Sequence, residues 1–392
     1  MRLLIAVYKE LINTNILVIG NGFDLAHGLP TRYRDFMNYL GAAKSLYENK
    51  KDWLAHPAKD IIENSQNKKL NEISDILKQN LIREYDSNWI QNFPEVLIKI
   101  FSKENCWYHY FEDLIDKKKL IGINWIDFEA EISNVVKRIE GISLHKPVNT
   151  NISTISHVYH LNQGPSREIL INFMTSDYYY FDNQEIDNFI SHLENDLSDF
   201  INALDYYIGF IDEFDVANRI SDIQGVRIDK VISFNYSDTY RRLYRNDMSD
   251  ENIHFIHGKA NHTLGDSASK LVLGTNDMLS DQEKDSNISC VKFKKYFQRI
   301  YKRTGNDYKR FLKEVDKERS GETIRSYFFG HSLSATDGDV IRRVIEASDH
   351  VVIFYHDDMQ HREAITNLVT VLGRDKLIEY AEERIEFRKQ RE

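Results

Sequence analysis

The first apolar segment of the chain, residues 15–20, runs directly into a glycine-rich turn, Gly20-Asn21-Gly22-Phe23-Asp24. Glycines at alternate positions permit a tight turn and let backbone N–H groups come close to an anion such as a phosphate. Asp24 would either cap the helix that follows or accept a hydrogen bond from a ribose hydroxyl. The segment is typical of a nucleotide-binding turn, and a plain strand-to-helix turn is also compatible with it.

The dinucleotide fingerprint of dehydrogenases, G-x-G-x-x-G, does not fit this turn. Leu25 stands where the third glycine is required. The fingerprint also needs an acidic residue at the end of a second strand about 20 residues later, and no strand is predicted there. We therefore do not expect a standard dehydrogenase site.

Three further groups of polar residues follow predicted strands. They are Asn235 with Ser237 and Asp238, His257 with Gly258, and the turn Gly330-His331-Ser332-Leu333. Ligands bind outside the carboxyl ends of the strands in an open parallel sheet, so these groups and the glycine turn should converge. Taken singly, a strand-end Asn is often a turn former and a strand-end His is often structural. Four such groups at one predicted edge of the sheet favour a functional site.

Short apolar runs alternate with longer amphipathic stretches along the chain. The runs occupy residues 15–20, 227–234, 253–257, 270–274, 324–330 and 350–355. Their aliphatic content and short length are typical of buried parallel strands covered by helices on both faces. We therefore predict an α/β fold with a doubly wound, mostly parallel, Rossmann-like sheet.

The stretch between the first two predicted strands is charged and repeats apolar residues at helical spacing. We predict a discontinuous nucleotide-binding core, residues 1–35 and 226–392, interrupted by a mainly helical insertion or lid over residues 36–225. Helical tracts are also predicted at residues 306–318 and 360–390.

The charge balance and the cysteine count limit the function classes. Lys and Arg total 51 against 61 Asp and Glu, a formal net charge of −10, which does not favour nucleic acid as a partner. The two cysteines, Cys106 and Cys290, are far apart and form no C-x-x-C motif. This excludes a disulfide scaffold and a Cys-rich zinc site and favours a reducing compartment. No segment is long and apolar enough for a membrane span, so we expect a cytoplasmic protein without a membrane partner.

Residues 292–303 interleave basic and aromatic side chains, a pattern also found in nucleic-acid-binding segments. Phe293, Tyr296, Phe297 and Ile300 follow helical spacing. We interpret the segment as an ordinary amphipathic helix with these four residues on its buried face.

The glycine turn extends to Gly-Asn-Gly-Phe-Asp-Leu-Ala-His-Gly-Leu-Pro-Thr over residues 20–31. Its G-x-G-x5-G-[IL]-P spacing is similar to the nucleotide loop of the sirtuin superfamily. The full wording resembles the bacteriophage abortive infection family AbiH, and the chain is identified as a member of that family with a sirtuin-like core. Residues 124–129, Asn-Trp-Ile-Asp-Phe-Glu, resemble a further AbiH motif within the helical insertion.

The resemblance implies an effector of anti-phage defence that binds NAD or a related nucleotide as substrate and hydrolyses its nicotinamide glycosidic bond without a metal. By the resemblance, Asn235 would orient the nicotinamide ribose or a water molecule, and His257 would be the general base. The implied nucleotide-binding residues are Gly20, Asn21, Gly22, Phe23, Asp24, Gly330, Ser332 and Asp238. A phage-derived trigger or a co-encoded defence protein would be the partner, and the pattern leaves a homo-oligomer open.

Two departures from sirtuins qualify this expectation. The four-cysteine zinc module of sirtuin deacetylases is missing, which disfavours an acyl-lysine substrate. Asp24 stands where sirtuins often have Ser, and Ser237 where they commonly have Asp, so a nucleotide other than NAD stays open. The alternatives are a catalytically inactive nucleotide-binding sensor or partner module, and a nuclease.

Overall fold

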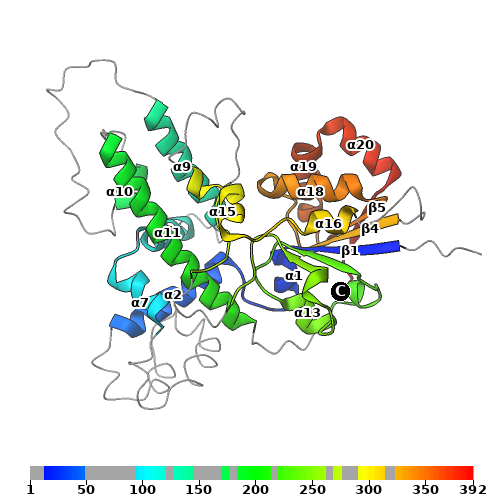
Figure 1. Ribbon diagram of the computed structural model, residues 1–392, viewed down its shortest axis with the longest axis horizontal. Coiled ribbons are helices and arrows are strands. Elements are labelled where there is room, and N and C mark those ends of the chain that lie inside the picture. The colour runs from blue at the N-terminus through cyan, green and yellow to red at the C-terminus, as the bar shows by residue number, and fades with distance from the viewer. Residues whose placement is uncertain are drawn as a thin grey trace, which may run out of the picture. The chain divides into compact units, whose positions relative to one another are not determined.

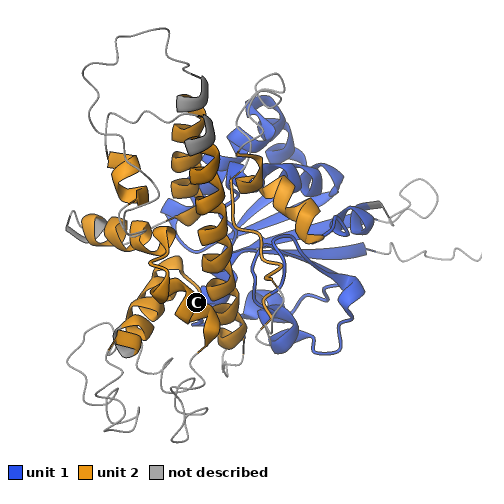
Figure 2. Ribbon diagram, turned by 60° about the vertical axis from the view of Figure 1, so that its left-hand side comes forward, with its two compact units in different colours: residues 1–29, 215–259, 304–392 blue, residues 30–214, 260–303 orange. Residues whose placement is uncertain are grey.

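The computed structural model describes residues 13–48, 94–120, 127–144, 169–175, 183–212, 219–261, 268–275, 290–313 and 323–391. The chain divides into two compact units (Figure 2). Unit 1 comprises residues 1–29, 215–259 and 304–392, and unit 2 comprises residues 30–214 and 260–303. The sequence-based division places residues 260–303 in the nucleotide-binding core, whereas here they group with the helices of unit 2.

Unit 1 contains a six-stranded sheet in which every neighbouring pair of strands is parallel. The strands are β1 (Asn13–Ile19), β2 (Lys230–Ser233), β3 (Ile253–Phe255), β4 (Thr323–Phe329), β5 (His350–Tyr355) and β6 (Ile385–Lys389). Their order, β3-β2-β1-β4-β5-β6, reverses direction between β1 and β4. This confirms the predicted Rossmann-like α/β fold, and it places the topological switch point beside the glycine turn.

Both faces of this sheet are buried because successive side chains of each strand point to opposite sides. In β1, Ile16 and Val18 contribute to one apolar cluster and Leu17 and Ile19 to the other, and all four side chains are buried. The first cluster includes side chains from α16 (Tyr308–Lys313), α18 (Gly338–Ala347), α19 (Asp358–Leu372) and α20 (Arg374–Glu383). The second includes side chains from α1 (Asn21–Ala26), α12 (Ser221–Gln224) and α13 (Thr239–Tyr244). The sheet is therefore the middle layer of three (Figure 1).

Two local predictions are wrong. The predicted C-terminal helix over residues 360–390 ends at Glu383, and β6 follows and pairs with β5. The charged composition of β6 suits an edge strand, where one side faces solvent, but in the sequence it resembles the end of a helix. The predicted strand at residues 270–274 has no regular secondary structure. At Leu273 the Gln298 side chain, in place of a neighbouring strand, bonds both the backbone N–H and the C=O at 3.0 Å.

Unit 2 is helical over most of its described residues. Its elements are α2 (Tyr33–Glu48), α7 (Glu95–Ser102), α8 (Cys106–Leu120), α9 (Phe128–Leu144), α10 (Ile169–Thr175), α11 (Asn183–Ile211), the 3-10 turn η5 (Val291–Phe293) and α15 (Lys295–Lys302). The long helix α11 contacts α7 and α8. Fully buried aromatic rings of Phe36, Phe111, Phe128 and Phe200 pack edge to face or stack in its core.

Neither cysteine of the chain is part of a disulfide, and both are buried. No helix among the described residues combines the length and the apolar character that a membrane crossing requires.

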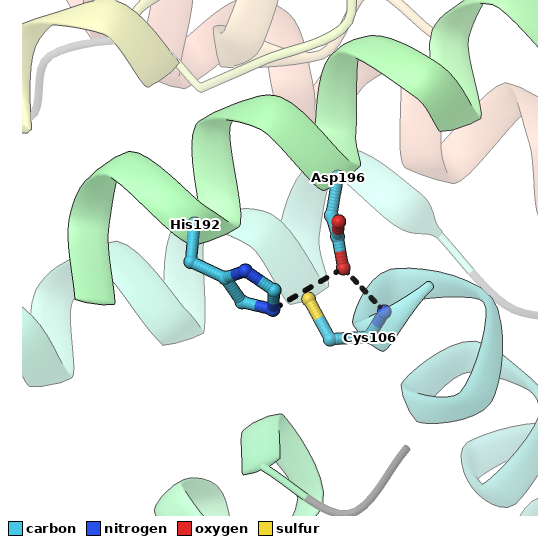
Figure 3. Close-up of side chains that lie close together, drawn as sticks. All are labelled: Cys106, His192 and Asp196. Carbon is cyan, nitrogen blue, oxygen red and sulfur yellow. Dashed lines mark hydrogen bonds and ion pairs between the residues drawn. The ribbon is translucent and has the colours of Figure 1, made fainter. Parts of the chain in front are cut away.

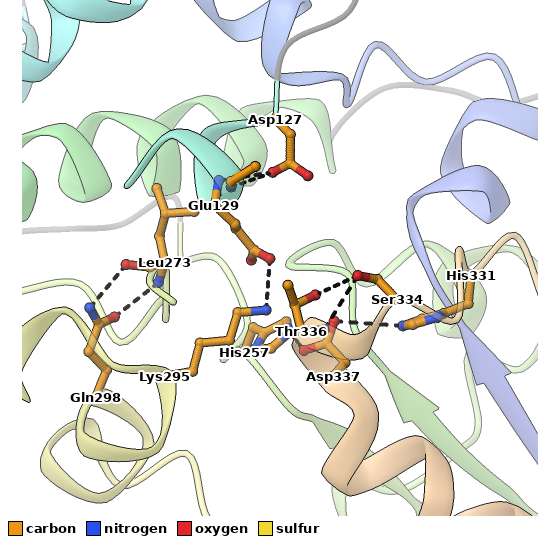
Figure 4. A network of polar contacts seen from close by, with 11 residues as sticks. Asp127, Glu129, His257, Leu273, Lys295, Gln298, His331, Ser334, Thr336 and Asp337 are labelled. Carbon is orange, nitrogen blue, oxygen red and sulfur yellow. Dashed lines mark hydrogen bonds and ion pairs between the residues drawn. The ribbon is translucent and has the colours of Figure 1, made fainter. Parts of the chain in front are cut away.

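The second AbiH-like motif, residues 124–129, begins α9. Residues 124–126 lie outside the described residues. Asp127 caps the helix, since its Oδ1 accepts hydrogen bonds from the N–H groups of Glu129 at 2.9 Å and Ala130 at 3.2 Å. Glu129 then pairs with Lys295, with 2.8 Å between Oε2 and Nζ (Figure 4). In this unit the motif starts a helix and supplies the partner of a buried lysine.

Helix α15 contradicts the prediction of an ordinary amphipathic helix. Lys295 is fully buried and Gln298 is buried, whereas Ile300 is 73% exposed and Tyr301 76% exposed. The helix is thus inverted, with polar side chains inward. The reason is that both buried polar groups have partners, Glu129 for Lys295 and the Leu273 backbone for Gln298, so their burial leaves no unsatisfied group.

Because Lys295 is fully buried, removing the charge of its partner should be costly. We expect Glu129→Gln to lower the free energy of unfolding by about 3 kcal/mol, since the buried ammonium would lose this carboxylate. The matched control is Glu194→Gln, which breaks the exposed Lys292–Glu194 pair and should cost less than about 1 kcal/mol. Urea unfolding of both variants measures the difference, and equal costs would contradict the buried placement of Lys295.

Candidate functional site

The glycine turn after β1 packs directly against the turn after β4 in unit 1. Gly20 N–H donates to the carbonyl of Phe329 at 3.2 Å, and Gly22 N–H donates to the carbonyl of Gly330 at 2.8 Å. A Cβ atom at Gly22 would lie 2.7 Å from Cα of Gly330. Close approach of two chain segments therefore explains these glycines, and their contact with a nucleotide stays a prediction.

The turn after β4 has two residues in the left-handed region of backbone conformation, Gly330 at φ 65° and Leu333 at φ 57°. A Cβ at Gly330 would come within 2.2 Å of the Phe23 nitrogen. A positive φ is unfavourable for leucine, but Leu333 is fully buried and its N–H donates to Nδ1 of His331 at 2.8 Å. This bond also fixes the His331 tautomer, since Nδ1 accepts and Nε2 must carry the proton.

Asp24 lies within α1 and is 1% exposed. It does not cap that helix, whose N-cap residue is Gly20. Its Oδ2 instead accepts a hydrogen bond from the Ser237 hydroxyl at 2.5 Å, and Ser237 accepts one from the Thr239 hydroxyl at 3.1 Å. The Asp24 carboxyl thus joins the glycine turn to the loop that follows β2.

Burial raises the pKa of Asp24 to about 6, because a carboxylate inside the protein loses its hydration. Hydrogen bonds from Ser237, Thr239 and Asn235, together with the charge of Arg242, oppose the rise in pKa without cancelling it. Asp24 is therefore a carboxyl group that titrates near neutral pH inside the candidate site.

Asn235 follows β2 and is buried, with 5% of its surface exposed. The Ser233 hydroxyl holds its backbone, accepting from the Asn235 N–H and donating to the Asn235 carbonyl, each at 3.2 Å. Its side-chain amide is close enough to Asp24 to lower the pKa of that carboxyl. The rings of Phe234 and Tyr236, on either side of it in sequence, lie 5.7 and 6.3 Å from the His257 ring.

The carboxylate of Asp337 lies beside two histidines, His257 and His331. Asp337 Oδ1 lies 3.1 Å from Nε2 of His257, and Asp337 Oδ2 lies 3.9 Å from Nε2 of His331 (Figure 4). All three side chains are almost completely buried. Nε2 is thus the ring nitrogen of His257 that faces the carboxylate, and a proton on Nε2 would leave Nδ1 as the basic nitrogen. This is the arrangement of a general base held by an acidic partner.

The other predicted site residues have diverse surroundings. Asp238 accepts hydrogen bonds from Arg241 Nε at 2.8 Å and from Lys259 Nζ at 2.7 Å, so its charge is compensated by protein cations. Phe23 is fully buried in the core cluster that includes Phe329. Asn21 and Ser332 are exposed. Asn21 and Ser332 are accordingly the predicted residues best placed to meet a solvent-borne ligand.

Sequence reasoning missed Asp337 and did not assign a role to His331. The residue type of Asp337 and its position after a turn indicate a helix cap. Asp337 does occupy the N-cap position of α18, but its side chain makes no capping hydrogen bond. The available signal was its place shortly after the Gly-His-Ser-Leu turn. Sequence alone could not reveal that this turn brings the carboxylate to a histidine 80 residues earlier.

A comparison with protein-family models gives a match over residues 16–356 to the family described as bacteriophage abortive infection AbiH. The chain belongs to the AbiH family. The match begins within β1, includes the helical unit and ends directly after β5. No curated protein and no solved structure gives a significant match. Membership of AbiH indicates a role in abortive infection by bacteriophage.

The contact between the two turns of this AbiH protein predicts that Gly22 is intolerant of any side chain. We expect Gly22→Ala to lower the free energy of unfolding by about 2 kcal/mol, because its methyl group meets backbone that cannot rotate away. Gly225→Ala is the matched control, since a Cβ there meets nothing within 4 Å. Chemical unfolding measures both changes, and a tolerated alanine at Gly22 would refute the close packing.

The raised pKa of Asp24 predicts how stability depends on pH. The folded state binds a proton more tightly than the unfolded state, so this contribution to stability is present at low pH and is lost as pH rises through about 6. Between pH 8 and pH 5, wild type should gain about 1.4 kcal/mol relative to Asp24→Asn, which cannot titrate. Unfolding curves at both pH values test this, and parallel pH profiles would show that Asp24 has an ordinary pKa.

Proposed function

We propose that this AbiH protein acts in abortive infection by hydrolysing the nicotinamide glycosidic bond of NAD. The observation that carries the proposal is the buried His257–Asp337 pair, which lies with Asn235 on loops that follow parallel strands. Loss of NAD would deprive an infected cell of a metabolite that phage replication also needs.

The position of these residues supports a nucleotide as the ligand. Asn235 and His257 come after β2 and β3, and the glycine turn and His331 come after β1 and β4, where the strand order reverses. Nucleotides bind at this edge of doubly wound sheets. The sheet order alone does not determine the reaction, so the chemistry is argued from the side chains.

The reaction requires little acid catalysis. Nicotinamide in NAD is a cationic leaving group and departs as a neutral molecule with the electron pair of the glycosidic bond. A water molecule adds its oxygen to the ribose C1′, and Nδ1 of His257 accepts the proton that this water loses. Asp337 stabilises the imidazolium that results, and Asn235 positions the ribose or the water.

A second contact supports the sirtuin resemblance. Asp24 and Ser237 stand where sirtuins often have Ser and commonly have Asp, and in this chain the two side chains bond each other at 2.5 Å. The two positions at which this chain departs from sirtuins therefore bond each other. This bond links the two loops of the proposed site.

One observation favours the alternative of a nucleotide-binding sensor without turnover. The N–H groups of Gly20 and Gly22, which a phosphate would otherwise engage, already donate to backbone carbonyls of the β4 turn. A sensor would bind the nucleotide through side chains and transmit its presence to a partner. Under this alternative, changes at His257 would leave phage protection intact.

The test is nicotinamide release from NAD by the purified protein and, in phage-infected cells, the size of the NAD pool. His257→Ala and Asn235→Ala should each lower the rate by about 100-fold or more, the usual contribution of a positioned acid–base group. Asp337→Asn should lower it as well, because the amide can present an N–H to the histidine and favour the wrong tautomer.

Asp339→Asn is the matched control, since Asp339 is an exposed carboxylate two residues from Asp337. It should keep the wild-type rate. An unchanged NAD pool in infected cells that are nevertheless protected would overturn the hydrolase and favour the sensor.

A further inference from the structure

Unit 2 holds a group of three potential metal ligands that the proposed NAD chemistry does not use. The Cys106 thiol begins α8, and His192 and Asp196 lie one helical turn apart on α11 (Figure 3). One ligand atom from each residue lies within 4.8 Å of the other two. Figure 3 shows the two α11 side chains pointing toward the cysteine.

The Nε2 atom of His192 is available to bind a metal. Nε2 of His192 is buried and makes no hydrogen bond with any described residue. Asp196 Oδ2 lies 3.6 Å from it, which is too long for a hydrogen bond. In tetrahedral zinc sites the ligands lie about 2.0 to 2.3 Å from the metal, so neighbouring ligand atoms are about 3.3 to 3.8 Å apart. The 3.6 Å separation matches a metal between them better than direct contact.

From this geometry we infer that Cys106, His192 and Asp196 bind a divalent transition metal of the zinc type. Thiolate, imidazole and carboxylate are the zinc ligands of proteins, and two ligands four residues apart on one helix face the same side. Three protein ligands leave a fourth position for water or another ligand. This inference is independent of the proposed NAD hydrolysis, and it departs from the expectation of a metal-free protein.

The surroundings of the ligands resemble the supporting shell of a metal site. Asp196 Oδ2 accepts a hydrogen bond from the Cys106 N–H at 2.7 Å, and the Asp196 carbonyl accepts one from the Asn105 side chain at 2.7 Å. These bonds hold the start of α8 against the middle of α11 before any metal arrives. Such preorganisation by neighbouring groups is what orients ligands in metalloproteins.

A catalytic cysteine is the other reading of a Cys–His–Asp group, and the structure disfavours it. Cys106 is completely buried, and burial together with the neighbouring Asp196 raises its pKa well above the ordinary value. A nucleophilic cysteine needs the opposite, an accessible thiol with a lowered pKa. A metal ion would supply the positive charge that a thiolate requires in this position.

The test uses Co²⁺ as a spectroscopic probe and Zn²⁺ as the competing ion, added to the full chain after treatment with a chelator. We expect one equivalent of Co²⁺ to bind with the near-ultraviolet absorption of a cobalt–thiolate bond, and Zn²⁺ to displace it. Zn²⁺ at 100 times its dissociation constant should raise the unfolding temperature of the full chain by roughly 3 °C.

Cys106→Ser and His192→Gln should each weaken metal binding by about 100-fold or more, and the serine variant should lose the thiolate absorption. The matched control is Cys290→Ser, because Cys290 is the other buried cysteine of unit 2 and lies outside the group. Asp196→Asn tests the carboxylate while its amide oxygen can still accept the Cys106 N–H. Wild type without thiolate absorption, or equal affinity in wild type and Cys106→Ser, would overturn the metal site and leave a hydrogen-bonded thiol.

Discussion

The close packing of two turns at the centre of the sheet is the constraint on which unit 1 depends. The turn after β1 and the turn after β4 touch through the backbones of Gly20, Gly22 and Gly330, with no room for a Cβ atom at any of the three. The strand order reverses between β1 and β4, and the helices that follow these two strands, α1 and α18, cover opposite faces of the sheet. Because the two turns touch through their backbones, the loops that follow β1, β2, β3 and β4 lie close to one another.

Shared carboxylates organise the polar side chains that this packing collects. Asp337 faces both His257 and His331, and Asp24 receives the Ser237 hydroxyl. Each carboxylate is buried and joins segments that are far apart in sequence. Hydrogen bonds in such low-dielectric surroundings are strong, and their loss is expensive because the remaining partner stays buried. The same groups can therefore position a ligand and hold the loops together.

Unit 2 uses buried polar groups in a similar way at different places. Lys295 and Gln298 turn the polar face of α15 inward, because Glu129 and the Leu273 backbone satisfy them. Cys106 and Asp196 join α8 to α11 in the same manner. In both cases the side chain that determines the packing is polar, which is why apolar periodicity describes these helices poorly.

The sequence by itself determined the α/β class and the AbiH family. Short aliphatic runs that end in a small or polar residue are typical of buried parallel strands, and five of the six predicted runs contain a strand. The wording of residues 20–31 indicated the family. Strand β6 was not predicted, because an edge strand that is half exposed to water has a charged composition like that of a surface helix. The inward-facing polar side chains of α15 were not predicted, because an interpretation from helical periodicity takes the apolar face of a helix as the buried one.

Only the tertiary structure decided which polar residues meet. The pairing of His257 with Asp337 and of Asp24 with Ser237 spans 80 and 213 residues of chain, and no local pattern encodes it. Asp337 in particular has the residue type and the N-cap position of a helix cap, and neither distinguishes a cap from the partner of a histidine. The spacing of residues along a segment predicts its secondary structure. The partner of a buried charge depends instead on which distant segment the fold places beside it.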